Sequence, residues 1–215
     1  MKHKQGHRVW IHDRGKVIEW DSSGKPLKMF GTHYDITEKK LMEDKIRELS
    51  IRDPLTNIYN RRYLFQRFAS DLEKYKRDRE PFSVSVIDID HFKRINDTLG
   101  HPAGDYIIKQ FTDILSDNIR PYDLLGRYGG EEFLIIQYNS EREQTAGRIE
   151  GILEKIRDNE FHYQKKSIQF TFSCGICDTE EFNSDELTIE DMVQTADRRL
   201  YQAKSNGRNR VAYTD

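Results

Sequence analysis

The chain has 215 residues, of which 33% are charged and 11% aromatic, and its formal net charge is −2. This length fits one enzyme-sized domain with a fragment of another, and the aromatic content with so small a net charge excludes a disordered chain. The near-neutral charge excludes the basic surface of a general nucleic-acid-binding protein, and the lack of both a secretion signal and an apolar run of about 18 residues predicts a cytoplasmic chain without membrane contact.

Residues 1–36 are predicted to form a short β-meander. Strand-like patterns at residues 8–12, 16–20 and 27–34 are separated by the turn sequences Asp13-Arg-Gly and Asp21-Ser-Ser-Gly-Lys-Pro. Two or three strands cannot bury a core of their own. We therefore expect either that they pack on another part of the protein or that their domain is incomplete here.

Residues 37–52 are predicted to form a linker helix, which Pro54 ends. Met42, Ile46 and Leu49 are spaced four and then three residues apart, and most other positions carry Glu or Lys. Such a narrow apolar seam favours pairing with an identical helix. The alternative is a solvated connector, which two heptads are too few to exclude.

Residues 53–215 are predicted to form an α/β sandwich with one mixed sheet flanked by helices. Strands alternate with helices around an internal hairpin whose turn contains Gly129 and Gly130. Helical patterns cover residues 62–75, 91–98, 105–119, 141–157 and 189–206, and strand patterns cover residues 82–89, 124–128, 131–138, 166–177 and 210–213.

The two cysteines, Cys174 and Cys177, formally match a redox motif. They lie in a segment that alternates like a strand, so their side chains are expected on opposite faces of the sheet. Two further ligands at zinc spacing are also missing. We therefore interpret both cysteines as structural.

Two acidic pairs are candidates for metal chemistry. Asp88 and Asp90 end the apolar strand, and Glu131 and Glu132 follow the glycines of the hairpin. In open α/β sheets, ligands bind near the carboxyl ends of strands, and a tight turn would bring the second pair beside the first. Carboxylate oxygens are the ligands with which Mg²⁺ is held while it carries substrate phosphates.

Phosphate groups would also need cations and free backbone N–H groups. The helix that begins at His91-Phe-Lys offers both, because Lys93 lies in its first turn. Lys204 and Arg208 add positive charge near the end of the last long helix. For Lys204 alone, a favourable charge at a helix C-terminus is the simpler explanation.

Four segments, taken together and in order, resemble the signatures of the GGDEF family, the bacterial diguanylate cyclases. They are Asp53-Pro-Leu-Thr-Asn-Ile-Tyr-Asn-Arg-Arg, Asp88-Ile-Asp-His-Phe-Lys-Arg-Ile-Asn-Asp-Thr-Leu-Gly-His-Pro-Ala-Gly-Asp, Arg127-Tyr-Gly-Gly-Glu-Glu-Phe and Ala196-Asp-Arg-Arg-Leu-Tyr-Gln-Ala-Lys-Ser-Asn-Gly-Arg-Asn. Asn57 stands where the family usually has Gly, and Asn tolerates the left-handed conformation better than most residues. The resemblance implies a palm-like nucleotidyl cyclase fold and the condensation of two GTP into cyclic di-GMP with release of two pyrophosphates.

The resemblance also implies roles for individual residues. Asp88 and Glu132 become metal ligands through their carboxylates and Ile89 through its carbonyl, for two Mg²⁺ or Mn²⁺ ions per active site, and Glu131 helps to deprotonate the ribose 3′-hydroxyl. The guanine-reading residues are Asn96 and Asp105, and the phosphate contacts are Phe92, Lys93, Lys204 and Arg208.

A symmetric product requires two GTP-loaded domains that face each other, so the resemblance implies a homodimer. Residues 8–40 are similar to the end of a PAS sensor domain. The resemblance therefore divides the chain into a PAS fragment (1–36), a signalling helix (37–52) and the cyclase domain (53–215), which implies a PAS-regulated enzyme of bacterial second-messenger signalling.

Arg120-Pro-Tyr-Asp123 would by itself be an ordinary surface pair. The family carries an inhibitory Arg-x-x-Asp motif at this spacing, which implies a site where cyclic di-GMP acts as product and inhibitor. The Arg fork suits a phosphate or the guanine Hoogsteen edge, and Asp can accept from guanine N1 and N2.

Two other functions compete with a GTP-condensing enzyme. A non-catalytic receptor would bind GTP or cyclic di-GMP and relay a PAS signal, but the presence of both Glu131 and Glu132 favours the enzyme. A cyclase that accepts ATP would make a mixed dinucleotide, and Asp105 argues against it because adenine offers no matching donors.

Overall fold

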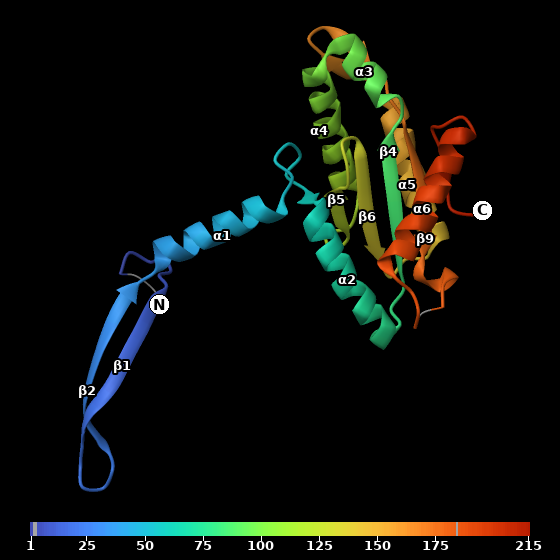
Figure 1. Cartoon of the computed structure of the whole chain (residues 1–215). Coiled ribbons are helices and arrows are strands. Elements are labelled where there is room, and N and C mark those ends of the chain that lie inside the picture. The colour runs from blue at the N-terminus through green and yellow to red at the C-terminus, as the bar shows by residue number, and fades with distance from the viewer. Residues whose placement is uncertain (2–3, 184) are drawn as a thin grey trace. The chain divides into compact units, whose positions relative to one another are not determined.

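The computed structural model describes residue 1 and residues 4–183 and 185–215 (Figure 1). The chain divides into two compact units, Met1–Ser50 and Ile51–Asp215. None of the described helices has the length and apolar character needed to cross a membrane.

The first unit contains a two-stranded antiparallel hairpin followed by a helix. Strands β1 (Ile11–Trp20) and β2 (Pro26–Asp35) pair along most of their length, and α1 follows at Thr37–Ile51. The predicted turn at Asp13-Arg-Gly is wrong, because these residues lie inside β1 and Gly15 pairs with Gly31. Continuous pairing across the hairpin overrides the local turn preference, so the expected meander is one long hairpin.

The helix predicted at residues 37–52 is α1, and its bounds agree to within one residue at its end. Met42, Ile46 and Leu49 have exposed fractions of 59%, 61% and 73%, and no residue of α1 is buried. The helix therefore presents an apolar seam that its own unit does not cover.

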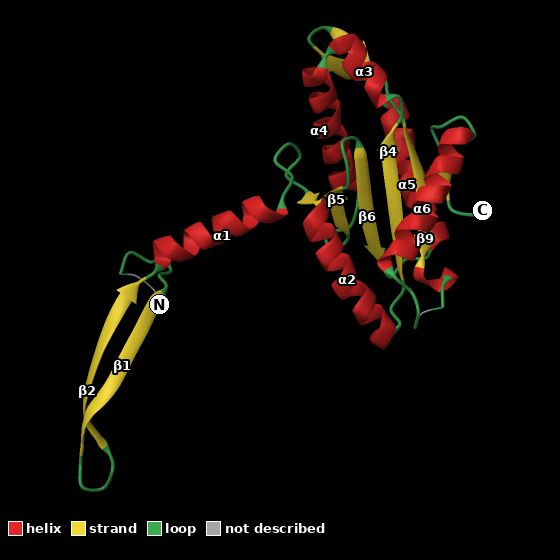
Figure 2. Ribbon diagram, in the orientation of Figure 1, coloured by secondary structure: helices red, strands yellow, loops and turns green. Residues whose placement is uncertain are grey.

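The second unit is built around a mixed six-stranded sheet with helices on both faces (Figure 2), which confirms the predicted fold class. The strand order is β10-β9-β4-β6-β5-β3; β4 runs antiparallel to both neighbours, whereas the edge strands β10 and β3 run parallel to theirs. The strands of the sheet are β3 (Tyr59–Asn60), β4 (Phe82–Ile89), β5 (Leu124–Arg127), β6 (Glu132–Tyr138), β9 (Phe172–Asp178) and β10 (Val211–Ala212). The helices are α2 (Arg61–Asp78), α3 (Phe92–Leu99), α4 (His101–Asn118), α5 (Arg142–Asp158) and α6 (Ile189–Ser205).

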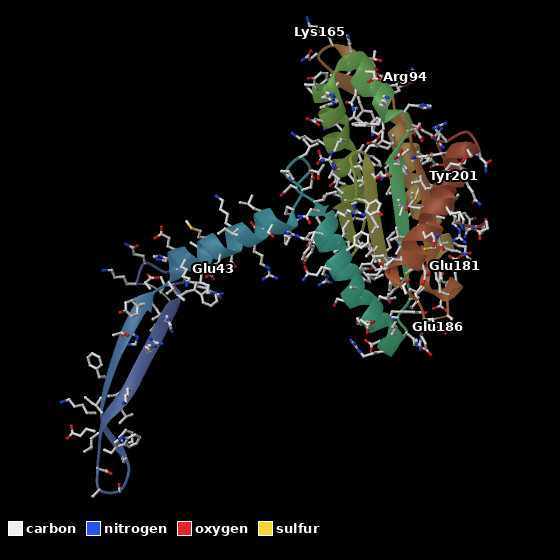
Figure 3. The ribbon with its side chains drawn as sticks, viewed as in Figure 1. Glu43, Arg94, Lys165, Glu181, Glu186 and Tyr201 are labelled. Atoms are coloured by element: carbon white, nitrogen blue, oxygen red, sulfur yellow. The ribbon has the colours of Figure 1, made fainter. Side chains whose placement is uncertain are left out.

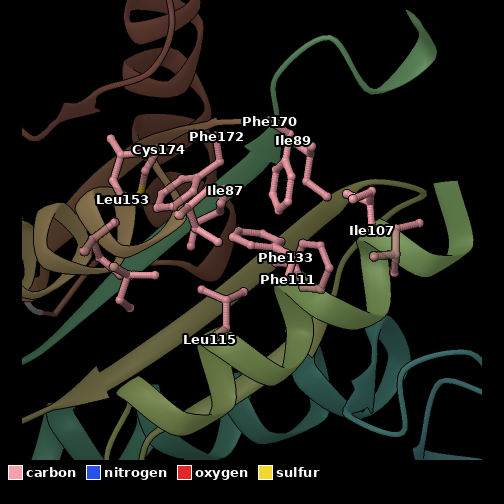
Figure 4. Close-up of a cluster of buried hydrophobic side chains, with 14 of the residues drawn as sticks. Ile87, Ile89, Ile107, Phe111, Leu115, Phe133, Leu153, Phe170, Phe172 and Cys174 are labelled. Atoms are coloured by element: carbon pink, nitrogen blue, oxygen red, sulfur yellow. The ribbon is translucent and has the colours of Figure 1, made fainter. Parts of the chain in front are cut away.

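Two hydrophobic cores lie on the two faces of this sheet. Every residue of β4 is buried, and its side chains alternate: Ile87 and Ile89 pack with α4 and α5, whereas Val84 and Val86 pack with α2 and α6. Figure 4 shows the first of these cores, where the ring of Phe111 from α4 meets that of Phe133 edge-on. The strand that ends in the acidic pair is thus held rigidly from both sides.

Cys174 and Cys177 lie on β9 and belong to opposite cores, as predicted. Both thiols are free and buried, and burial raises the pKa of each well above its ordinary value. A buried thiol that resists deprotonation is a poor nucleophile and metal ligand, which agrees with a structural role.

Apart from shifts of one to three residues at element ends, the second unit differs from the sequence-based prediction in three main ways. The strand predicted at residues 166–177 is broken: β8 (Lys166–Ile168) pairs with β7 (Phe161–Tyr163) outside the main sheet, and β9 begins at Phe172. The short strands β3 and β7 were not predicted, because each depends on a partner strand rather than on its own pattern. Helix α4 begins at His101, earlier than predicted, since Pro102 is compatible with the first turn of a helix.

Candidate active site

The two acidic pairs meet at one end of the sheet, as predicted. The register of β4 and β6 places Asp88 directly opposite Glu132, and the Ile89 amide donates to the Glu131 carbonyl at 3.3 Å. Asp88 is only 9% exposed. The hairpin therefore carries Glu131 and Glu132 to the end of the buried strand.

The loop between β5 and β6 is fixed by close contacts. The Tyr128 and Gly129 amides both donate to the Glu132 carbonyl, at 2.8 and 3.2 Å. A Cβ at Gly129 would lie 2.3 Å from the Glu132 carboxylate, so a larger residue there would displace that carboxylate from its present position. Arg127 donates from Nε and Nη2 to the Gly130 carbonyl at 3.0 and 2.7 Å, which holds the tip of the loop.

The carboxylates at this end of the sheet outnumber the nearby cations. Burial raises the pKa of Asp88, the neighbouring Glu131 and Asp90 add to the effect, and Lys204, whose Nζ lies 2.9 Å from Asp88, only partly opposes it. Burial and the charge of Asp88 raise the pKa of Glu132 in the same way. In both carboxyls, burial and neighbouring negative charge disfavour the ionised form more than the nearby Lys204 stabilises it.

Asp197 on α6 adds a further carboxylate to Asp88 and Glu132, and it was not identified from the sequence. Burial raises its pKa, and its charge contributes to the raised pKa of Glu132. It precedes Lys204 by seven residues, which is two helical turns and hence the same face of α6. That spacing was the signal that could have identified it.

This donor set fits a hard divalent cation. Among the described residues, no three His, Cys, Asp or Glu side chains form a complete metal group. The protein would instead supply the two carboxylates of Asp88 and Glu132 with the Ile89 carbonyl. Such a partial set is typical of Mg²⁺, which is usually bound by one or two carboxylates together with substrate phosphates and water.

Four predicted phosphate contacts lie on the segments that leave the sheet here. Phe92 and Lys93 begin α3 directly after His91, which adopts a left-handed φ of 56°. Phe92 is buried and Lys93 is exposed. Lys204 lies in the last turn of α6, and Arg208 follows in an exposed turn with a left-handed φ of 61°.

The predicted guanine-reading residues lie on two helices joined at a glycine. Asn96 is on α3, Asp105 is exposed on α4, and Gly100 between the helices has a φ of 84°. The Asn96 Oδ1 atom is buried and has no hydrogen-bond partner among the described residues. A Cβ at Gly104 would lie 2.0 Å from this oxygen. A buried acceptor left unpaired is costly, so it fits a site that a ligand N–H completes.

Asp90 has different partners from Asp88 and Glu132, although the sequence pairs it with Asp88. Its side chain accepts hydrogen bonds from Thr171, Ser173 and Asn209, which approach from other segments. The two acids at the end of β4 therefore have different partners.

The Arg120-x-x-Asp123 segment is not an ordinary surface ion pair. Asp123 is 8% exposed, and its carboxylate accepts from the backbone amides of Arg120 at 3.1 Å and Tyr138 at 3.3 Å. Burial raises its pKa, which the positive charges of Arg120 and of Arg148 on α5 partly offset. The Arg120 guanidinium lies 5.7 Å from the centroid of the Tyr122 ring instead of capping the carboxylate. Arg148 was not identified from the sequence.

The turn after α1 is tied directly to the acidic loop. Asp53 accepts from Leu55, Thr56 and the Thr56 hydroxyl, and Arg127 Nη1 lies 3.1 and 3.3 Å from its two carboxylate oxygens. Asn57 in this turn adopts a left-handed φ of 60°, as its place in the turn predicted. Arg127 thus links the start of the second unit to the loop that carries Glu131 and Glu132.

Comparison with known proteins agrees with this geometry. The family model described as "Diguanylate cyclase, GGDEF domain" matches residues 50–210. The chain is 38% identical over 173 residues to a probable diguanylate cyclase, DgcT, of Escherichia coli, a match that covers 79% of this chain and 37% of that protein. It spans 37%, 57% and 44% of the lengths of three curated relatives.

Solved structures show the same architecture. The coiled coil and GGDEF domain of DgcB from Caulobacter crescentus, in complex with c-di-GMP, is similar with a TM-score of 0.78 at 25% identity, over 83% of this chain and 93% of that one. The active GGEEF domain of a diguanylate cyclase from Vibrio cholerae is similar with a TM-score of 0.66 at 33% identity, over 73% of this chain and 97% of that one.

Proposed function

The chain belongs to the GGDEF family, and from that premise we propose that it is an active diguanylate cyclase that condenses two GTP into cyclic di-GMP and two pyrophosphates. The observation that carries the proposal is the intact acidic site: Glu131 and Glu132 are both present on a loop that Arg127 holds beside Asp88. A receptor without catalysis would not need this second carboxylate.

Asp88, Glu132 and the Ile89 carbonyl would hold divalent cations, Mg²⁺ or Mn²⁺, with two ions in each active site. When bound, these ions would neutralise charge at the α-phosphate and lower the pKa of the attacking 3′-hydroxyl. Glu131 would accept the proton of that hydroxyl as a general base. Lys204, already 2.9 Å from Asp88, would bring a positive charge to the phosphates at the same place.

Recognition of guanine would come from α3 and α4. The unpaired Asn96 oxygen can accept from the N2 amino group, and Asp105 can accept from guanine N1 and N2. Adenine has neither donor on that edge, which favours GTP over ATP. Phe92, through its backbone amide, together with Lys93 and Arg208 would contact the phosphates. Equal incorporation of ATP in a mixed-nucleotide assay would contradict this assignment.

We further propose that the enzyme works as a homodimer. Each domain would supply one GTP, and the exposed seam of Met42, Ile46 and Leu49 on α1 supports pairing with a second copy. The solved DgcB structure includes a coiled coil with its GGDEF domain.

Residues 1–36 are proposed to be the end of a PAS sensor domain that regulates the cyclase. The hairpin leaves large apolar side chains exposed, among them Trp20 at 57% and Phe30 at 67%. Such side chains on a two-stranded unit support a packing partner.

Product inhibition is proposed at Arg120 and Asp123. The Arg120 guanidinium lies over the Tyr122 ring rather than on the Asp123 carboxylate, and that carboxylate is held in place by two backbone amides. The Arg120→Ala variant should then keep its initial turnover but lose inhibition by added cyclic di-GMP. Equal inhibition of the variant and the wild type would return both residues to a structural role.

The central experiment incubates the purified chain with GTP and Mg²⁺ and identifies the product by mass spectrometry. We expect cyclic di-GMP from the wild type, and loss of most turnover in Glu131→Gln and Asp88→Asn. Glu150→Gln, an exposed position on α5, is the matched control and should behave like the wild type. GTP binding without product at high protein concentration would favour the receptor.

A further inference from the structure

Asp90 is a buried carboxylate that has no role in the proposed reaction. It is 4% exposed, although it lies only two residues after Asp88. Its Oδ2 accepts from the Thr171 hydroxyl at 2.7 Å and from the backbone amide of Asn209 at 2.9 Å. Its Oδ1 accepts from the Ser173 hydroxyl at 2.7 Å. All three donors are uncharged, so hydrogen bonds and not an ion pair hold this buried carboxylate in place.

The third of these donors belongs to the turn that carries Arg208. Arg208 and Asn209 adopt left-handed φ angles of 61° and 54°. Two consecutive non-glycine residues in this region are strained, and such a turn persists only where its surroundings hold it. Several hydrogen bonds stabilise this turn. The Arg208 backbone amide donates to the Ala203 carbonyl, and Arg157 on α5 donates to the Asn209 side-chain oxygen and to the Asn209 carbonyl, each at 2.8 Å.

Asp90 connects this turn to the start of α3. It directly follows β4 and precedes His91, Phe92 and Lys93, and its own amide donates to the Thr171 carbonyl at 2.8 Å. One residue therefore ties the metal-binding strand, the beginning of α3 and the turn of Arg208 to one another. The break in the strand predicted at 166–177, which brings Thr171 to Asp90, is part of the same arrangement.

We propose that Asp90 is a positioning residue that acts through Arg208: it holds the turn at Arg208 and Asn209 so that Arg208 and the start of α3 meet the same phosphate group. This inference rests on the proposed function, in which Arg208 contacts a phosphate of GTP. Asp90 itself touches neither the metal ions nor the substrate.

The Asp90→Asn variant separates this role from that of a metal ligand. An asparagine can keep all three hydrogen bonds, because its amide oxygen can accept from Thr171 and Asn209 while its amide nitrogen donates to the Ser173 hydroxyl, which can rotate. Asp90→Ala removes all three. A positioning role predicts that Asn functions far better than Ala, whereas a metal-ligand role predicts that both fail.

The test measures kcat and KM for GTP in single and double variants. We expect Asp90→Ala and Arg208→Ala each to raise KM by about tenfold. Combining them should raise it by no more than about twofold over Arg208→Ala alone, because the proposed effect of Asp90 on the substrate passes through Arg208. Asp90→Asn should stay within about threefold of the wild type. Additive losses, or an Asn variant as impaired as Ala, would overturn the proposal.

A control and a second variant separate positioning from general destabilisation. Asp178 is equally buried at 3%, and accepts backbone amides at the opposite end of β9, near the Glu181 labelled in Figure 3. Asp178→Ala should lower the melting temperature but leave KM unchanged. Should Asp90→Ala fail to fold, Arg157→Ala at an exposed position must still raise KM, because it loosens the same turn.

Amide hydrogen exchange at Asn209, without nucleotide, keeps this inference distinct from the proposed function. Asp90→Ala should accelerate exchange at this amide, since its acceptor is gone. An unchanged exchange rate would show that Asp90 does not hold the turn, even if the wild type made no cyclic di-GMP. If the wild type is active and Asp90→Ala leaves KM unchanged, the positioning role of Asp90 is refuted while the proposed function stands.

Discussion

Replacing Arg127 by Met should weaken both the fold and the acidic loop. The change removes two contacts to the Asp53 carboxylate, at 3.1 and 3.3 Å, and two hydrogen bonds to the Gly130 carbonyl, at 3.0 and 2.7 Å. Methionine keeps much of the aliphatic stem, so the loss is mainly electrostatic. We expect reduced turnover as well, because the loop that carries Glu131 loses the hydrogen bonds from Arg127 that position it.

The magnitude follows from the burial of the pair, whose side chains are 17% and 16% exposed. Exposed ion pairs contribute at most about 1 kcal/mol, whereas breaking a fully buried pair costs about 3–5 kcal/mol. We therefore expect Arg127→Met to lower the free energy of unfolding by about 2 kcal/mol and the melting temperature by about 4–8 °C. In a double-mutant cycle with Asp53→Asn, the coupling energy should be about 1 kcal/mol.

The effect should depend on pH in a defined direction. Burial acts to raise the pKa of Asp53, but the hydrogen bonds from Thr56 and the charge of Arg127 hold it below its ordinary value. A carboxyl with a lowered pKa in the folded state contributes stability above its unfolded pKa of about 3.9, and that stability is lost as the pH falls through the folded value. The stability gap between the wild type and Arg127→Met should therefore narrow below about pH 4.

Urea denaturation followed by far-UV circular dichroism measures these values. Both tryptophans, Trp10 and Trp20, lie in the first unit, so their fluorescence would not report the unfolding of the second. A coupling energy below about 0.3 kcal/mol, or a difference in stability that does not change between pH 7 and pH 3, would show that the Arg127–Asp53 pair does not stabilise the fold.

Three further outcomes can be measured. The pKa values of Asp88 and Glu132 are raised in the folded state, so without metal the free energy of unfolding should fall as the pH rises from their ordinary pKa values to the raised ones. Mg²⁺ at neutral pH should raise the melting temperature of the wild type but not that of Asp88→Asn. Gly104→Ala should displace the Asn96 side chain and raise KM for GTP about tenfold with little change in kcat, and an unchanged KM would disconnect Asn96 from the substrate. Ile46→Asp should place a charge in the apolar seam of α1, so specific activity and the dimer fraction in sedimentation should both decline at low protein concentration; a stable dimer would contradict this use of the helix.

Features that depend on neighbouring residues could be predicted from the sequence. The apolar run at Phe82–Ile89 is a fully buried strand, and the spacing of Cys174 and Cys177 puts them on opposite faces. Asn57 takes the left-handed conformation that its turn requires. Side-chain periodicity and turn preferences depend only on residues close together in the sequence, so these properties can be predicted before any tertiary contact is known.

Features that depend on residues far apart in the chain could not be predicted from local patterns. Gly31 pairs with Gly15 and so abolishes a turn that Asp13-Arg-Gly would favour alone. Asp88 and Asp90 are the same residue type two positions apart, yet one faces Glu132 and Lys204 while the other is held by Asn209, which lies 119 residues away. Strand register and helix packing determine which partner each acid meets, and no local pattern specifies those contacts.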